Sequence, residues 1–219
     1  MNGVGFPAHI IKIAIIKYIR VHIMFIAIEG IDGSGKTTQA NRLAEMLRRD
    51  GFDALTTKEH TDGIIGKEIQ RVLEHKEKVD ALTLQIMFVA DRSDHVHKYA
   101  DIINDRSKFL ITDRYLYSTI AYGTAAGVSN EYLVELNSVF PVPDALFIIL
   151  IDPIIAMKRI DRDSGRSSRE LFEKEEFLDD VQANYKKFKN ATFIDGEMPA
   201  DEITQIMYKT AIREFGRRS

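Results

Sequence analysis

The sequence predicts a three-layer α/β fold, in which a five-stranded parallel sheet carries helices on both faces and a short lid. Short apolar runs alternate with longer segments of helical periodicity, the pattern of strands joined by crossover helices. One run, ALFIILI at residues 145–151, is apolar throughout, as expected for a central strand covered on both faces. A glycine-rich stretch, EGIDGSGKTT at residues 29–38, follows the first run and predicts a tight strand-to-helix turn.

The strands are predicted from short apolar runs bounded by polar residues, glycine or proline. The predicted strands are Phe25–Glu29, Ala54–Thr57, Phe109–Asp113, Ala145–Ile151 and Thr192–Ile194.

The helices are predicted from apolar spacing and from residues typical of helix ends. Gly51 is a stop signal for the first helix, Ser129 is a typical N-cap, and Asp152-Pro153 supplies an N-cap and a first-turn proline. Four residues share one face of the first helix: Ala40, Leu43, Ala44 and Leu47. Further helices are predicted at residues 80–104, 170–188 and 201–215.

The composition indicates one globular domain over residues 24–219. Thirty basic and 33 acidic residues give a net charge of −3, so no overall basic field gathers nucleic acid, and we expect no nucleic-acid partner. The absence of cysteine fits a reducing compartment. Residues 1–23 are expected to be an N-terminal appendage of unknown role, an added edge strand or helix, or a start-site artefact. Lys12, Lys17 and Arg20 interrupt its apolar stretch too often for a membrane span of about 20 uninterrupted apolar residues.

The glycine-rich stretch has the pattern G-x-x-x-x-G-K-[ST] between a predicted strand and a predicted helix. Its glycines let successive backbone N–H groups point at phosphate oxygens, and the helix N-terminus adds partial positive charge. Lys36 then reaches the β- and γ-phosphates of ATP, and the Thr37 hydroxyl ligates Mg²⁺. We therefore expect a P-loop NTPase-type fold that binds ATP through Gly30, Ile31, Asp32, Gly33, Ser34, Gly35, Lys36, Thr37 and Thr38.

Three classes of nucleotide-binding protein carry such a loop: GTPase switches, ATPase motors or regulators, and kinases with a small acceptor. GTPase switches usually carry an Asn-Lys-x-Asp tetrapeptide, and the sequence contains none. The third predicted strand ends in Asp113-Arg114, where the acid can hold Mg²⁺ through water and the cation can clamp an anionic acceptor. This pair favours the kinase, and a non-kinase ATPase switch stays an alternative.

Six segments taken together resemble the thymidylate kinase family, over residues 24–195. They are FIAIEGIDGSGKTTQANRLAEML, TTKEHTDGIIG, FVADRSDH, TDRYLYSTIAYG, PDALFIILIDP and FEKEEFLDDV. The resemblance implies an enzyme that uses ATP and Mg²⁺ to phosphorylate dTMP to dTDP, usually as a homodimer in the cytoplasm. A kinase for another nucleotide or for a deoxynucleoside is the nearest alternative.

The resemblance also implies roles for the acceptor-binding residues. Asp32 would hold the 3′-hydroxyl of dTMP, and Lys58 and Arg114 would contact its phosphate. Phe88 would stack on thymine and Arg92 would bond its edge, as suits a flat apolar ring and a planar cation with fixed donors. Further implied contacts come from Ser118 beside the base and from Tyr122, whose ring would crowd the sugar 2′ position.

The stretch RIDRDSGRSSR at residues 159–169 suggests a mobile lid, about 159–170, that closes arginines over the transferring phosphoryl group. Gly33 stands where one subgroup of the family has an arginine, so the catalytic arginine is expected from the lid. Arg166 is the first candidate and Arg169 the next, and Arg159 is expected to pack on adenine. The expected catalytic set is Lys36, Arg114, Arg166 and Asp32.

The sequence departs from the family pattern at several positions. Lys58 and His60 replace the usual arginine and proline, which removes a bidentate donor from the expected phosphate contact. Gly123 stands where many members have glutamine, and residues 170–173 lack one expected lid arginine. His95 and His97, with His60, are interpreted as a solvated helix surface rather than a metal site.

Overall fold

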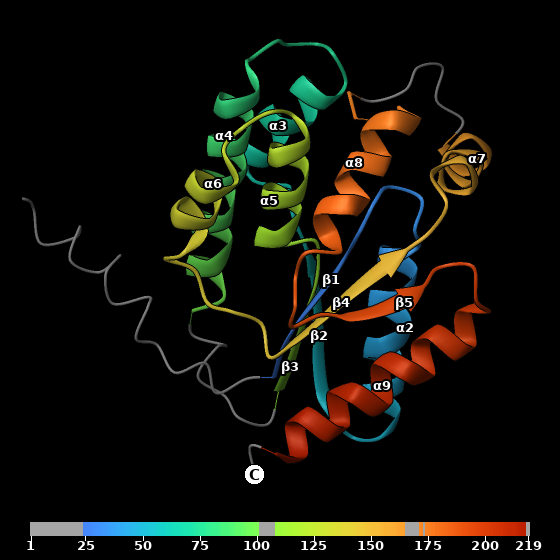
Figure 1. Ribbon diagram of the computed structural model, residues 1–219. Coiled ribbons are helices and arrows are strands. Elements are labelled where there is room, and N and C mark those ends of the chain that lie inside the picture. The colour runs from blue at the N-terminus through green and yellow to red at the C-terminus, as the bar shows by residue number, and fades with distance from the viewer. Residues whose placement is uncertain (1–23, 101–107, 165–170, 173, 218–219) are drawn as a thin grey trace, which may run out of the picture.

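A five-stranded parallel sheet forms the centre of the protein in a computed structural model, which describes residues 24–100, 108–164, 171–172 and 174–217 (Figure 1). The predicted appendage, residues 1–23, lies outside the described residues. The strands lie in the order β2-β3-β1-β4-β5. They are β1 (Met24–Gly30), β2 (Asp53–Lys58), β3 (Lys108–Asp113), β4 (Ala145–Leu150) and β5 (Thr192–Asp195).

The five predicted strands are confirmed, with bounds that differ by one residue or less at each end. The middle position belongs to β1, whose seven residues are all buried. The apolar β4 lies next to it, between β1 and β5, so it is an interior strand although not the middle one. Both strands are apolar because helices cover the sheet on both faces.

Two helical layers enclose the sheet (Figure 1). On one face, α2 (Lys36–Arg49) and α9 (Ala200–Gly216) pack with alternate residues of the strands into one apolar core. A second core on the other face includes residues of α5 (Leu116–Ala125) and α8 (Glu175–Tyr185). The remaining helices are α3 (Ile64–Leu73), α4 (Ala81–Lys98), α6 (Asn130–Asn137) and α7 (Pro153–Ser164).

The predicted helix ends carry the expected contacts. Gly51 follows α2 with a φ of 88°, a left-handed conformation that glycine adopts without steric cost. The Ser129 hydroxyl accepts a hydrogen bond from the Tyr132 N–H at the start of α6, and Asp152 accepts one from the Ile154 N–H at the start of α7. Each cap satisfies a backbone donor that the helix itself cannot pair.

Three helix bounds differ from the predicted ones. The predicted helix 170–188 is shortened to α8, because the Leu171 N–H donates to the Leu73 carbonyl and the Phe172 ring stacks on Phe177 at a centroid separation of 5.1 Å. In the predicted helix 80–104, α4 ends at Lys98. Within the predicted lid, α7 continues through Ser164, so Arg159 and Arg162 are helical, while residues 165–170 lie outside the described part of the chain.

Among the described residues, no helix is both long and apolar enough to cross a membrane.

Candidate active site

The glycine-rich loop curls between the end of β1 and the start of α2. Gly35, directly before α2, has a φ of 93°, and Gly33 has a φ of 77°, values that a residue with a side chain rarely adopts. A Cβ atom on Gly33 would lie 2.3 Å from the carbonyl oxygen of Ala156 in α7, so the loop packs too closely there for any side chain. The loop thus places its backbone amides at a helix N-terminus, an arrangement suited to phosphate.

Lys36 is buried inside this loop. Its Nζ donates to the Ile31 carbonyl oxygen at 2.8 Å and lies 3.9 Å from an Asp32 carboxylate oxygen. Burial lowers the pKa of Lys36, the nearby charge of Arg114 lowers it further, and Asp32 and Asp113 oppose the shift. The amino group is therefore held at the loop, where the oxygens of a phosphate chain could accept hydrogen bonds from it.

Thr37 and Asp113 form the pair expected to hold the metal. The Thr37 hydroxyl donates to Oδ2 of Asp113 at the carboxyl end of β3. The other carboxylate oxygen, Oδ1, is buried and has no hydrogen-bond partner among the described residues. An unpaired buried carboxylate oxygen next to a hydroxyl fits a Mg²⁺ site, because Mg²⁺ prefers oxygen ligands and usually needs only one or two from the protein.

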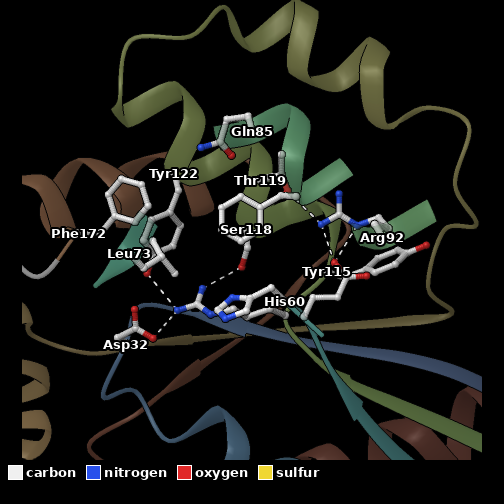
Figure 2. A pocket seen from close by; sticks show the side chains of 13 residues that line it. Asp32, His60, Leu73, Gln85, Arg92, Tyr115, Ser118, Thr119, Tyr122 and Phe172 are labelled. Carbon is white, nitrogen blue, oxygen red and sulfur yellow. Dashed lines mark hydrogen bonds and ion pairs between the residues drawn. The ribbon is translucent and has the colours of Figure 1, made fainter. Parts of the chain in front are cut away.

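Two cavities meet above the carboxyl ends of the strands. The larger, about 760 Å³, lies over the phosphate loop and extends to Arg159 and Met198. The smaller, about 110 Å³, lies between α4, α5 and Phe172 (Figure 2). Asp32, Glu59 and Arg114 line both cavities, so a ligand in one would approach a ligand in the other at these residues.

Arg114 stands at the junction of the cavities. Its backbone has a φ of 69°, which is uncommon outside glycine and is held by a hydrogen bond from its N–H to the Ile28 carbonyl. Its guanidinium donates to Asp32 at 2.6 Å, to the Ser118 hydroxyl at 3.0 Å and to the Tyr122 hydroxyl at 3.3 Å (Figure 2). Burial alone would lower its pKa, but Asp32 and the neighbouring tyrosines hold the pKa of Arg114 well above the usual value.

Most residues expected to bind the acceptor line the smaller cavity. Phe88 lies in its wall, with its ring 6.2 Å from the His60 ring, and Ser118 and Tyr122 face Arg114. Lys58 does not line it: this side chain lies at the edge of the larger cavity and pairs with Asp62 at 3.1 Å. Lys58 therefore lies near the expected acceptor site but does not line the smaller cavity.

Arg92 lines the smaller cavity, but its guanidinium is already engaged in a buried network. It is only 1% exposed, and its guanidinium donates twice to Glu59, at 2.9 and 2.7 Å, and once each to Asn137 and Thr119. Within the described part of the chain, Nη1 donates to Asn137. The contact between Arg92 and the base edge stays a prediction. It requires the second N–H of Nη1, or a rearrangement of the hydrogen bonds to Glu59, Asn137 and Thr119.

His95 continues this buried network, so the expectation of a solvated helix surface is wrong for this residue. Its Nδ1 lies 2.9 Å from a Glu59 oxygen and its Nε2 lies 2.6 Å from the Thr57 hydroxyl. Glu59 thus receives bonds from two residues of α4 and fastens that helix to the end of β2.

Several residues of the site were missed in the sequence. Glu59, Gln85, Thr119 and Phe172 line the smaller cavity. Thr119 could have been found because it follows Ser118 at the start of a helix, whereas Gln85 and Phe172 come from segments with no local signal. Glu29, in β1, was also missed: it is buried and accepts hydrogen bonds from Tyr115, Ser118 and Tyr185.

The predicted lid is only partly placed by the structure. Arg159 lines the larger cavity, where its Nη2 donates to the Gly196 carbonyl at 3.1 Å, and Arg162 lines the same cavity. Arg166, expected to be catalytic, lies outside the described residues. Its role therefore stays a prediction.

Comparison with known proteins identifies the family of this site. The family model for thymidylate kinase matches residues 28–205. A probable thymidylate kinase of Methanocaldococcus jannaschii is 39% identical over 162 residues, which cover 74% of this chain and 79% of that protein. The chain belongs to the thymidylate kinase family.

Two further comparisons agree with this membership. A probable thymidylate kinase of Methanosphaera stadtmanae is 36% identical over 199 residues, 88% of this chain and 98% of its own length. The solved structure of thymidylate kinase from Candida albicans has the same fold, with a TM-score of 0.69, 24% identity and coverage of 90% of this chain and 93% of that one. Thymidylate kinases are phosphotransferases that phosphorylate dTMP, with ATP as the donor, and this is the reaction of the family.

Proposed function

We propose that this protein transfers the γ-phosphoryl group of ATP to dTMP, with ATP in the larger cavity and the nucleoside of dTMP in the smaller one. The observation that carries this assignment is the junction of the two cavities at Arg114 and Asp32. Direct transfer requires the donor and acceptor phosphates to be held in line and close together. A junction lined by a partly buried arginine supplies a cation where the two negative phosphates have to meet.

The proposed donor site is the loop from Gly30 to Thr38. Its backbone N–H groups and the N-terminus of α2 attract the phosphate chain, and Lys36 donates to the β- and γ-phosphates. The buried position of Lys36 supports this role, because a charge outside bulk water interacts more strongly with a phosphate. Arg159, at the far end of the same cavity, is proposed to pack on the adenine ring.

Thr37 and Asp113 are proposed to hold Mg²⁺, Asp113 through water. The unpartnered Oδ1 of Asp113 supports this assignment. When bound, Mg²⁺ neutralises part of the charge on the phosphate oxygens. In this arrangement the Thr37 hydroxyl would be a direct ligand and Asp113 would hold a bound water, and the hydrogen bond between the two side chains keeps them together.

The proposed acceptor site is built around Arg114. Its fork would exchange Asp32 for the dTMP phosphate, and Lys58 would approach from the edge of β2. Asp32, once released, would accept a hydrogen bond from the 3′-hydroxyl. Phe88, Arg92, Ser118 and Tyr122 keep the roles that the family resemblance implies, supported by their place around one cavity.

Catalysis in this arrangement depends on position and charge. Lys36 and Arg114 would oppose the negative charge that spreads over the transferring group, and Arg166 would add a third cation from the lid. No side chain has to form a covalent bond with the phosphoryl group.

The test is a coupled assay of ADP release across dTMP, dUMP, dCMP, dAMP, dGMP and thymidine, with chromatography to identify the product. The proposal requires ADP release that depends on dTMP and yields dTDP. Preference for another monophosphate or for thymidine would assign a different kinase activity. ADP release without any acceptor would indicate an ATPase switch.

A homodimer and a cytoplasmic location are proposed with this function. Apolar side chains on α6 and just after it are exposed, and such groups are typical of interaction surfaces. They are Tyr132, Val134, Val139 and Val142. Light scattering coupled to size-exclusion chromatography tests the dimer: a mass near 25.0 kDa at all concentrations would contradict it.

A further inference from the structure

Gln85 lies on the wall of the smaller cavity and is not among the residues expected to bind dTMP. It lies on α4, three residues before Phe88 and seven before Arg92, a spacing that places all three on one helix face. Figure 2 shows Gln85 at the top of the group of lining side chains and Asp32 at the bottom, with Tyr122 and Ser118 between them. Gln85 therefore stands at the end away from the phosphate junction, where the base of a nucleotide would lie.

The carboxamide of Gln85 is buried with neither polar atom paired. The side chain is 0% exposed, and Oε1 and Nε2 have no hydrogen-bond partner among the described residues. The other four buried carboxamides in the described part of the chain each make at least one hydrogen bond: Gln39, Asn137, Gln182 and Asn184. Because an unpaired buried amide is costly, a carboxamide left unpaired on a cavity wall indicates a polar ligand.

Gly123 in α5 makes room for this side chain. A Cβ atom on Gly123 would lie 2.9 Å from Cγ and 3.1 Å from Cδ of Gln85, closer than such atoms normally approach. The absence of a side chain at Gly123 thus allows the Gln85 side chain to pack against α5 in the wall of the cavity. The two residues form one feature, although they are far apart in the sequence.

We propose that Gln85 is a specificity-determining residue that hydrogen-bonds the imide edge of the pyrimidine base, an inference that rests on the proposed function. The imide edge of thymine presents an N–H donor between two carbonyl acceptors. A carboxamide offers one acceptor and one donor side by side, so Oε1 can accept from N3–H while Nε2 donates to a neighbouring carbonyl. Arg92 has only donors and cannot accept the N3–H.

The amide can reverse its ends by rotation, so it can also pair with the N3 acceptor and the amino group of cytosine. Gln85 therefore adds affinity for a pyrimidine edge, while a donor-only group such as Arg92 favours a carbonyl over an amino group. Replacing the amide with a carboxylate removes the donor and leaves acceptors only, which suits cytosine better than thymine.

The experiment compares the wild type with Gln85→Met, Gln85→Glu and the control Gln205→Met. Gln205 is exposed on α9, on the opposite face of the sheet. Calorimetry gives the Kd of each protein for dTMP, dCMP and 2-deoxyribose 5-phosphate, which lacks the base. Thermal melting establishes that each variant is folded.

We expect Gln85→Met to weaken dTMP binding roughly 10-fold, the value of about one hydrogen bond, while the affinity for 2-deoxyribose 5-phosphate stays unchanged. Gln85→Glu should lower the preference for dTMP over dCMP, and Gln205→Met should match the wild type. An unchanged Kd for dTMP in Gln85→Met, or an equal loss for the ligand without a base, overturns the inference. If Gln85→Met does not fold, an unchanged dTMP to dCMP ratio in Gln85→Glu overturns it. A wild type that does not bind dTMP overturns the proposed function instead.

Discussion

The Ser118 hydroxyl donates a hydrogen bond of 2.5 Å to the carboxylate of Glu29, which lies at the centre of the sheet directly before the phosphate loop. The same carboxylate also accepts from the backbone of Tyr115 and from the Tyr185 hydroxyl. Glu29 thus fastens the segment that carries Arg114 and Ser118 to β1. Its position connects the acceptor side of the site with the donor side.

The burial of the Glu29 side chain leads to a prediction about the pH dependence of stability. Burial raises the pKa of Glu29 from 4.5 to about 7, although Ser118, Arg114, Tyr185 and Tyr115 oppose the shift. Because the folded protein then holds a proton that the unfolded chain releases, Glu29 contributes stability below pH 4.5 that is lost as the pH rises to 7. The loss is on the order of 3 kcal/mol.

Urea unfolding of the wild type and Glu29→Gln at pH 5, 6, 7 and 8 checks this expectation. The neutral amide cannot ionise, so the variant should gain free energy of unfolding relative to the wild type as the pH rises. Glu45→Gln, at an exposed position on α2, controls for the change in charge. A difference between wild type and Glu29→Gln that is constant over this range would contradict the assignment.

Lys36→Met is expected to reduce kcat by about 10²- to 10³-fold, because it removes a cation from the transferring phosphate. Binding of dTMP should change little, since Lys36 lines only the larger cavity. The coupled assay measures kcat, and calorimetry measures the Kd for dTMP. Lys209→Met, exposed on α9, is the matched control, and an active Lys36→Met would contradict the phosphate-loop assignment.

Thr37 allows a matched pair of substitutions. Thr37→Val keeps the shape but removes the hydroxyl, so the Mg²⁺ concentration for half-maximal activity should rise about 10- to 100-fold. Thr37→Ser keeps the hydroxyl and should stay near the wild type. Magnesium titrations of activity at saturating ATP and dTMP give the comparison, and equal magnesium dependence in both variants would rule out Thr37 as a ligand.

Arg166→Ala tests the first candidate among the lid arginines. If Arg166 stabilises charge only in the transition state, kcat should fall more than KM for dTMP rises. Steady-state kinetics against Arg213→Ala, an exposed arginine of α9, separates this effect from a loss of positive charge. The opposite pattern, a raised KM with an unchanged kcat, would make Arg166 a residue that binds the ground state.

The strands and the phosphate loop could be predicted because their signals are local. A strand covered on both faces is a run of apolar residues, as β1 and β4 are, and the loop needs its glycines in sequence. By contrast, α5 was not predicted, because its buried residues surround the helix and leave no regular polar face: Leu116, Thr119, Ile120, Ala121, Tyr122 and Gly123.

The candidate site was predictable only where a motif or the family resemblance named the residue. Nothing near Arg92 in the sequence indicates Glu59 as its partner, since the pair forms when α4 packs against the end of β2. The position of the Gln85 side chain depends on Gly123, which lies on another helix and leaves space for it. Local periodicity does not reveal such a contact between distant positions.

The shared wall of the two cavities has a thermodynamic consequence. A phosphate that takes Arg114 from Asp32 alters the surface seen by the nucleotide in the neighbouring cavity. In the proposed arrangement the two nucleotides would not bind independently: the factor by which the first changes the affinity of the second equals the factor by which the second changes the affinity of the first.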